Sequence, residues 1–336
     1  MAMQLLLFSI ILLIFLFLVP GIIKSSKKGT ENNTKTTDVY IDGDLASPVN
    51  EDAVSPQNEI ESVFDPELLS EDKKLIDIEE ERKIGNFTFR VRRFCIQKEG
   101  LNEAECEDKN ALTSKNNKIL RIAIADGATE SLFSDIWADI LVNAYTDKGA
   151  DIFKSSELEL LNKNFSDVTS NHILQMPETR QWYMYEKLER GTHATLAGAE
   201  FSSSDKMAIL TIGDSCVFWS DGNTEQINML PEITAEEFGI SPNSICHLPK
   251  SWQTLDRNIL RKEIKLEENL QMVLCTDALA CWLVTDLETI SFNWKKLFEI
   301  SDHSLFANFI ETLRKQNNIR NDDVTLVLIN VLPFNV

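Results

Sequence analysis

The sequence predicts an α+β fold of antiparallel sheets, preceded by an N-terminal transmembrane helix. Residues 3–23 contain no charged side chain, which is the pattern of a membrane-spanning helix. Beyond residue 85, apolar strand patterns follow one another in runs, without a helix after every strand. Such runs favour antiparallel sheets over a doubly wound parallel sheet. We therefore divide the chain into an anchor at residues 3–23, a tether at 24–84 and a folded domain at 85–336.

The apolar segment is long enough to cross a bilayer, because a helix rises ~1.5 Å per residue and the hydrocarbon core is ~30 Å thick. Lys24, Lys27 and Lys28 follow it directly. Since positive charge collects on the cytoplasmic side, we expect a single-pass membrane protein with a cytoplasmic C-terminal domain. An export signal is the alternative, although the basic residue that precedes such a signal is absent.

The tether at residues 24–84 is polar, acidic and interrupted by prolines, and it lacks sustained periodicity. Such a segment does not bury enough apolar surface to fold alone. Near its end, residues 66–83 suggest a short acidic helix.

The folded domain alternates runs of strands with a few helices. Helical spacing of Phe133, Ile136, Trp137, Ile140 and Leu141 predicts a helix with one buried face. Further helices are expected at residues 177–191, 287–300 and 304–317. Strands are expected at residues 87–95, 118–125, 192–202, 206–222, 270–277 and 322–334.

Composition excludes several classes of function. A formal net charge of −20 is unfavourable for binding nucleic acid. No Gly-rich phosphate loop and no dinucleotide-binding motif is present. Six cysteines without a CxxC pair are expected to be buried free thiols rather than zinc ligands.

Acidic residues recur beside strongly apolar strands. Asp108 lies shortly before the strand at 118–125, Asp126 ends that strand, Asp277 ends the strand at 270–277, and Asp322 and Asp323 precede the last strand. A single aspartate at such a place is usually a turn residue. Four such places in one domain instead indicate oxygen ligands for a hard divalent cation, because a buried carboxylate requires solvation, a partner or a metal.

Six segments appear in the order typical of a known family: "CEDKNAL", "IAIADGATES", "GTHATLAGAEF", "AILTIGDSCVFWSDG", "MVLCTDALACWL" and "NDDVTLVLINV". Together they resemble the PPM/PP2C-type metal-dependent Ser/Thr protein phosphatases, of which this chain looks like a divergent, bacterial-like member. The resemblance covers roughly residues 85–333 and implies an αββα sandwich of two antiparallel sheets flanked by helices. The "GDS" segment is similar to a family hairpin.

The resemblance also implies a mechanism and a set of site residues. Two Mg²⁺ or Mn²⁺ ions would hold a metal-bound water that attacks phosphoserine or phosphothreonine in a phosphoprotein substrate. Asp126 would bridge both ions, Gly127 would offer its carbonyl, and Asp277 and Asp322 would complete one coordination shell. Asp108 would act with Asp126 through the second ion. The expected partners are the phosphoprotein, the membrane through the N-terminal helix, and a cognate Ser/Thr kinase.

Departures from the family pattern leave an alternative open. The phosphate-holding arginine that many relatives carry falls near Glu103, and Arg90, Arg92 and Arg93 are candidate substitutes. Ala278 stands where a glycine is expected. The alternative is therefore a catalytically inactive module that binds phosphoproteins or scaffolds a complex. Asp214 is interpreted as a turn residue or buried acceptor, and His193 as a structural hydrogen bonder. The segment 231–256 is expected to lie over the site.

Overall fold

The structure, a computed structural model, describes residues 78–220, 226–239, 242–288 and 294–333. The chain divides into two units, 1–64 and 65–336, and all described residues belong to the second. The predicted anchor at 3–23 and residues 24–77 of the predicted tether lie outside the described residues. Within the described part, none of the helices combines the length and apolar character that a membrane crossing requires.

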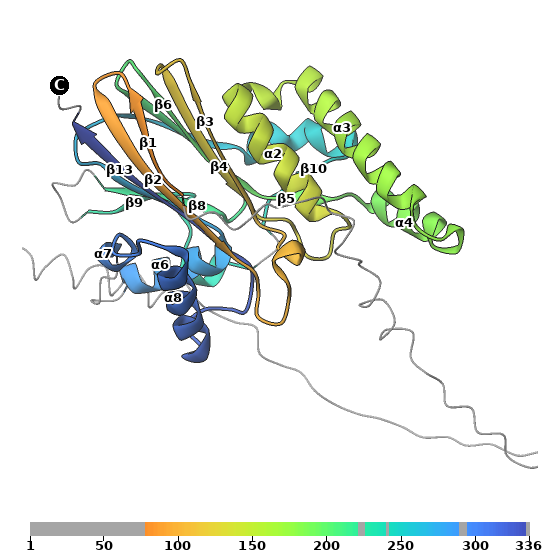
Figure 1. Ribbon diagram of the computed structural model, residues 1–336. Coiled ribbons are helices and arrows are strands. Elements are labelled where there is room, and N and C mark those ends of the chain that lie inside the picture. Colours follow the sequence, from red (N-terminus) through yellow and green to blue (C-terminus); the bar gives the residue numbers. More distant parts are fainter. Residues whose placement is uncertain (1–77, 221–225, 240–241, 289–293, 334–336) are drawn as a thin grey trace, which may run out of the picture. The chain divides into compact units, whose positions relative to one another are not determined.

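Two antiparallel sheets form the centre of the domain (Figure 1). The first sheet has six strands in the order β1-β2-β13-β12-β8-β9, and every neighbouring pair is antiparallel. Its strands are β1 (Ile78–Ile84), β2 (Phe87–Ile96), β8 (Cys216–Ser220), β9 (Asn228–Leu230), β12 (Gln271–Cys275) and β13 (Val324–Pro333).

The second sheet has five strands in the order β11-β7-β6-β4-β3, again antiparallel throughout. These are β3 (Lys109–Lys115), β4 (Ile119–Ala125), β6 (Leu196–Ser202), β7 (Lys206–Ile212) and β11 (Leu260–Lys265). A separate two-stranded ladder joins β5 (His193–Ala194) to β10 (Ile245–Cys246).

Helices cover the outer faces of both sheets (Figure 1). On the five-stranded sheet lies α2 (Ser134–Lys148), with α3 (Ser155–Leu174) packed on α2 and α4 (Glu178–Arg190) packed on α3. On the six-stranded sheet lie α6 (Asp277–Glu288), α7 (Trp294–Leu297) and α8 (His303–Lys315). The shorter elements are η2 (Glu103–Glu105), η3 (Gly149–Phe153), η4 (Ala235–Glu237), η5 (Pro249–Thr254) and α5 (Leu255–Asn258).

Three layers of buried apolar side chains hold this arrangement together. The central layer lies between the sheets, where the rings of Phe89 on β2 and Phe201 on β6 are 4.7 Å apart. Under α2 and α3, Trp137 meets Phe165 at 5.4 Å. Under α8, Phe306 stacks on Phe94 at 5.3 Å. The predicted pair of antiparallel sheets flanked by helices is thus confirmed.

The end of the predicted tether is part of the sheet. Residues 78–84 form β1, a strand rather than the predicted acidic helix, and β1 pairs along its whole length with β2. Opposite charges stabilise this strand pairing, because glutamates of β1 lie next to arginines of β2 on the neighbouring strand. Arg90 lies 3.0 Å from Glu79, and Arg93 lies 2.8 Å from Glu80. The six-stranded sheet therefore includes residues that precede the domain boundary predicted at residue 85.

Other expectations are corrected near the C-terminal half. Strands β7 and β8 belong to different sheets, so the "GDS" segment is a crossover between sheets and not a hairpin. The helix predicted at 287–300 is displaced, since α6 occupies Asp277–Glu288 and α7 only Trp294–Leu297. The long helix α3 was not predicted.

Candidate metal centre

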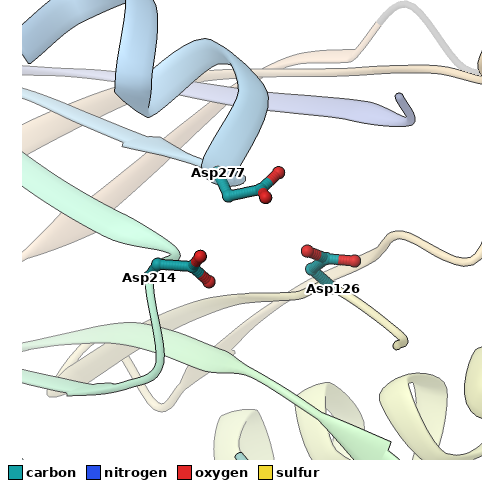
Figure 2. Close-up of side chains that lie close together, drawn as sticks. All are labelled: Asp126, Asp214 and Asp277. Atoms are coloured by element: carbon teal, nitrogen blue, oxygen red, sulfur yellow. The ribbon is translucent and has the colours of Figure 1, made fainter. Parts of the chain in front are cut away.

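Three aspartates from distant parts of the chain meet at one end of the two sheets. Asp126 follows β4, Asp214 lies between β7 and β8, and Asp277 opens α6 directly after β12. One carboxylate oxygen of each lies within 4.8 Å of the others, and Figure 2 shows the three side chains converging on a shared space. Asp126 and Asp277 are therefore brought together as predicted, and Asp214 completes the group.

The fold explains why these three residues meet. Asp126 ends a strand of the five-stranded sheet, whereas Asp277 follows a strand of the six-stranded sheet. Asp214 lies on the connection that passes from one sheet to the other. The carboxylates consequently approach one another across the gap between the sheets, where residues from both sheets could bind the same cation.

A hydrogen-bond network fixes Asp126 beside the crossover. The backbone N–H of Asp126 donates to the Thr195 hydroxyl at 3.1 Å, and the Thr195 N–H donates to the Asp126 carbonyl at 2.9 Å. The hydroxyls of Thr195 and Ser215 are 2.7 Å apart. Gly213 permits the turn, because its φ is +97° and an added Cβ would lie 2.6 Å from Thr195.

The backbone that surrounds Gly127 leaves no room for a side chain. A Cβ on Gly127 would lie 2.8 Å from the backbone of Ser134 at the start of α2. Its short bridge to Ala194 uses the N–H of Ala128 and the carbonyl of Asp126. The Gly127 carbonyl takes part in neither bond, which is compatible with its predicted role as a ligand.

Asp108 links the two sheets from the rear of the cluster. It is only 3% exposed, and its Oδ2 accepts the hydroxyl hydrogen of Thr276 at 2.9 Å, while the Thr276 hydroxyl accepts the N–H of Thr325. Its Oδ1 is buried and has no hydrogen-bond partner among the described residues. Asp108 thus lies outside the group of three but carries an unpaired buried oxygen.

The two adjacent acids before β13 have different roles. Asp322 is half-buried, and its Oδ1 accepts the N–H of Asp323 at 3.0 Å. Asp323 is 4% exposed and accepts the backbone N–H groups of Lys98 and Glu107, both at 2.7 Å. Asp323 therefore holds the segment that carries Asp108, whereas Asp322 lies beside the cluster without belonging to the group of three.

The electrostatic environment disfavours negative charge on the carboxylates. Burial, followed by the charge of Asp277, raises the pKa of Asp126 well above its ordinary value. Burial likewise raises the pKa of Asp108, and it raises the pKa of Asp277 to about 6 although Arg320 acts in the opposite direction. Burial also raises the pKa of Asp214. A bound cation would reduce the electrostatic repulsion among these carboxylates.

The donor set fits a hard divalent cation. All the candidate ligands are oxygens, as Mg²⁺ and Mn²⁺ prefer. Asp214, like Asp108, has a buried Oδ1 without a partner among the described residues. Buried polar atoms in native proteins normally have a hydrogen-bond partner or a bound ion. The two unpaired aspartate oxygens are therefore suitable ligands for a cation.

Asp214 is the member of this group that the sequence analysis interpreted as a turn residue or buried acceptor and not as a ligand. It follows the apolar strand β7 as Asp126 follows β4, so the criterion of a carboxylate at a strand end applied to it as well. Its carboxylate also accepts the N–H of Gly239, which brings the segment predicted to lie over the site into contact with it.

The structure also answers three smaller questions. Ala278 lies in the first turn of α6 and is 2% exposed, so the missing glycine is replaced by an earlier helix start. His193 contacts the Ser244 hydroxyl at 2.9 Å, as expected of a structural hydrogen bonder. The region around Glu103 supplies no cation, and Arg90 and Arg93 are held by the glutamates of β1.

With this geometry established, comparison with known proteins identifies the family. A family model described as "Protein phosphatase 2C" matches residues 100–324. The chain belongs to the protein phosphatase 2C family. No curated protein matches the sequence.

The solved structures that match this chain are distant from it in sequence. The catalytic domain of serine/threonine protein phosphatase PstP, in complex with two manganese ions, is 18% identical and covers 73% of this chain and 98% of its own, with a TM-score of 0.43. Stp1 from Staphylococcus aureus is 13% identical, covers 75% and 98%, and has a TM-score of 0.45. The phosphatase domain of SpoIIE from Bacillus subtilis is 12% identical, covers 75% and 96%, and has a TM-score of 0.41.

Proposed function

We propose that this protein hydrolyses phosphoserine and phosphothreonine in proteins, with Mg²⁺ or Mn²⁺ held by Asp126, Asp214 and Asp277. The observation that carries the proposal is the convergence of three carboxylate oxygens within 4.8 Å from both sheets of a protein phosphatase 2C domain. Asp108, Asp322 and the Gly127 carbonyl lie at the same end of the sheets and would supply further oxygens for a second ion. Bound divalent ions activate a water and offset phosphate charge.

The residues of the chain have distinct tasks in this reaction. Asp126 is fixed by its two hydrogen bonds with Thr195, and the next residue, Gly127, packs closely against the start of α2. Asp126 would therefore set the position of the ligand group. Asp108 is oriented by Thr276 and leaves one oxygen to orient a water. Asp323 holds the Asp108 segment in place through the two backbone N–H groups that it binds.

Hydrolysis of p-nitrophenyl phosphate and of a phosphothreonine peptide in the presence of Mn²⁺ tests this function. Activity is expected to disappear on addition of EDTA and in Asp126→Ala, and to persist in Asp151→Ala, which changes an aspartate that is 64% exposed. Binding of Mn²⁺ without turnover of either substrate would instead support the inactive phosphoprotein-binding module.

We further propose that residues 3–23 anchor the enzyme in a membrane with the phosphatase domain in the cytoplasm. The support is the uncharged apolar segment and the lysines that follow it. Membrane fractionation of the full chain and of a chain lacking residues 1–23 tests the anchor. A C-terminal alkaline phosphatase fusion tests the orientation, and an active fusion would contradict it.

A further inference from the structure

The phosphatase reaction needs a positive group for the substrate phosphate, and the arginines expected to supply it are bound elsewhere. Arg92 is 8% exposed and donates to the carbonyl of Phe298 at 3.1 Å and to that of Ile300. Arg93 donates to Asn110 at 3.0 Å, in addition to Glu80. None of the three arginines of β2 is thus available to the aspartate cluster.

Arg320 lies at the cluster itself. It precedes β13, and its guanidinium donates to Oδ2 of Asp277. Its Nη1 lies 2.9 Å from the position that a Cβ on Gly239 would occupy, so the guanidinium rests against the segment that contacts Asp214. The charge of Arg320 acts on both Asp277 and Asp214. It therefore sits at the edge of the ligand group between α6 and the loop after β9.

The guanidinium retains donors for a second partner. The side chain of Arg320 is 47% exposed, whereas that of Asp277 is 12% exposed. Among the described residues, Asp277 alone accepts a hydrogen bond from this side chain. Since a guanidinium carries five N–H donors in a planar fork that suits phosphate oxygens, the remaining donors are open to a ligand from the solvent side.

Resting on the proposed function, we propose that Arg320 is the residue that binds the substrate phosphate, and that it neutralises Asp277 when no divalent cation is present. Binding of phosphate and neutralisation of Asp277 would both use the Arg320 guanidinium at the edge of the aspartate cluster. With a divalent cation bound at Asp277, the ion pair of Arg320 with Asp277 would be weaker, and more of the guanidinium donors would be open to the phosphate.

The two roles predict opposite effects of one substitution. In Arg320→Ala, binding of inorganic phosphate in the presence of Mg²⁺ is expected to weaken about 10- to 30-fold, the equivalent of lost charge-assisted hydrogen bonds. Binding of Mn²⁺ without phosphate is expected to tighten about two- to fivefold, because a half-exposed ion pair no longer competes for Asp277. Arg320→Lys keeps the charge without the fork and should restore phosphate binding only in part.

Calorimetric titration of inorganic phosphate and of Mn²⁺ measures both effects without turnover. Arg261→Ala is the matched control, since Arg261 is also 47% exposed but lies on the edge strand β11 with Asp256 as its partner. Phosphate affinity of Arg320→Ala within twofold of the Arg261→Ala value overturns the proposal, and so does a parallel loss of Mn²⁺ binding. A wild-type protein that binds phosphate through Arg320 without hydrolysing phosphoesters would refute the proposed activity but not this assignment.

A second inference rests on a separate observation, the contact of two thiols. Cys95 at the end of β2 and Cys106 just before Asp108 are eleven positions apart in the sequence, and their Sγ atoms are 3.2 Å apart. Cys95 is half-buried and Cys106 is buried. The loop between them is bound to the segment before β13, through Lys98 to Asp323 and through Glu99 to Asn321 at 2.7 Å.

We infer that hydroperoxides convert this pair into a disulfide that locks the segment carrying Asp108. Hydrogen peroxide would oxidise the Cys95 thiol to a sulfenic acid with release of one water. The Cys106 sulfur then attacks the Cys95 sulfur, the S–O bond breaks and a second water leaves. Two thiols are oxidised by two electrons, and the peroxide is reduced to two waters.

Peptide mapping after graded peroxide treatment and thiol alkylation tests the pair. A cross-linked Cys95–Cys106 peptide that dithiothreitol reverses is expected at doses that oxidise Cys281 only to single-thiol products, since Cys281 is half-buried and its thiol contacts the carbonyl of Ala235. In Cys106→Ser, the Cys95 sulfenic acid should instead be trapped by dimedone. Independent alkylation of both thiols at doses that already oxidise Cys281 overturns the inference.

Discussion

The substitution Asp214→Asn separates the metal-binding role of Asp214 from a purely structural role. An amide keeps the shape and one oxygen acceptor, so the N–H of Gly239 retains its partner. It removes a negative charge whose oxygen lies within 4.8 Å of those of Asp126 and Asp277. At that separation and an effective dielectric constant of ~20, each like-charge pair costs about 3 kcal/mol.

The expected effect on the metal-free protein is stabilisation. The raised pKa values of the three carboxyls mean that part of the repulsion is already relieved by proton binding. We therefore expect a gain of about 1–2 kcal/mol in the free energy of unfolding, and a rise in Tm of about 3–6 °C for a domain of this size.

The stabilisation that Mn²⁺ adds is expected to decrease in the same variant. Mn²⁺ at 100 times the dissociation constant stabilises the wild type by about 2.7 kcal/mol. A tenfold weaker site gains about 1.4 kcal/mol under the same conditions, and a hundredfold weaker site about 0.4 kcal/mol. Thermal unfolding with EDTA and with Mn²⁺ measures both quantities, with Asp151→Asn as the exposed control. A metal-dependent shift as large as that of the wild type would show that Asp214 is only a buried acceptor.

Three further predictions concern the supports of the site and the core. Asp323→Ala is expected to lower the free energy of unfolding by about 3–5 kcal/mol, because a buried carboxylate that binds two N–H groups at 2.7 Å is lost. A loss in urea titration no larger than the ~0.5 kcal/mol typical of a surface substitution would contradict this role. Gly127→Ala should cost about 1–3 kcal/mol and weaken Mn²⁺ binding, since its Cβ meets the Ser134 backbone at 2.8 Å; unchanged calorimetric affinity would show that the neighbouring Asp126 did not move. Burial lowers the pKa of His247 from its ordinary value of about 6.5 to about 4 in the folded protein. Between these two pH values the imidazole binds a proton in the unfolded chain but not in the folded one. Stability due to His247 is therefore complete above pH ~6.5 and falls by up to about 3 kcal/mol as the pH drops towards ~4; His247→Gln should lose this slope in urea titrations across that range, and an unchanged slope would refute the assignment.

Much of the fold was accessible from the chain because its signals are local. Alternation and apolar runs located most of the strands, and the spacing around Trp137 located α2. The strand β1 was missed because its sequence "IEEERKI" carries little apolar signal and pairs through the arginines of β2, which are its neighbours only in the folded sheet. The extended conformation of β1 therefore depends on its contacts with β2.

The site shows the same division. The residue pattern alone places carboxylates at the ends of apolar strands, and on this ground it predicts Asp126 and Asp277 as ligands. The fold was needed to show that β7 and β8 lie in different sheets, which places Asp214 beside the other two carboxylates. It also decided that Arg320, and not an arginine of β2, reaches the cluster. Sheet partners and ion-pair partners depend on contacts between distant segments, whereas strand ends are marked by neighbouring residues.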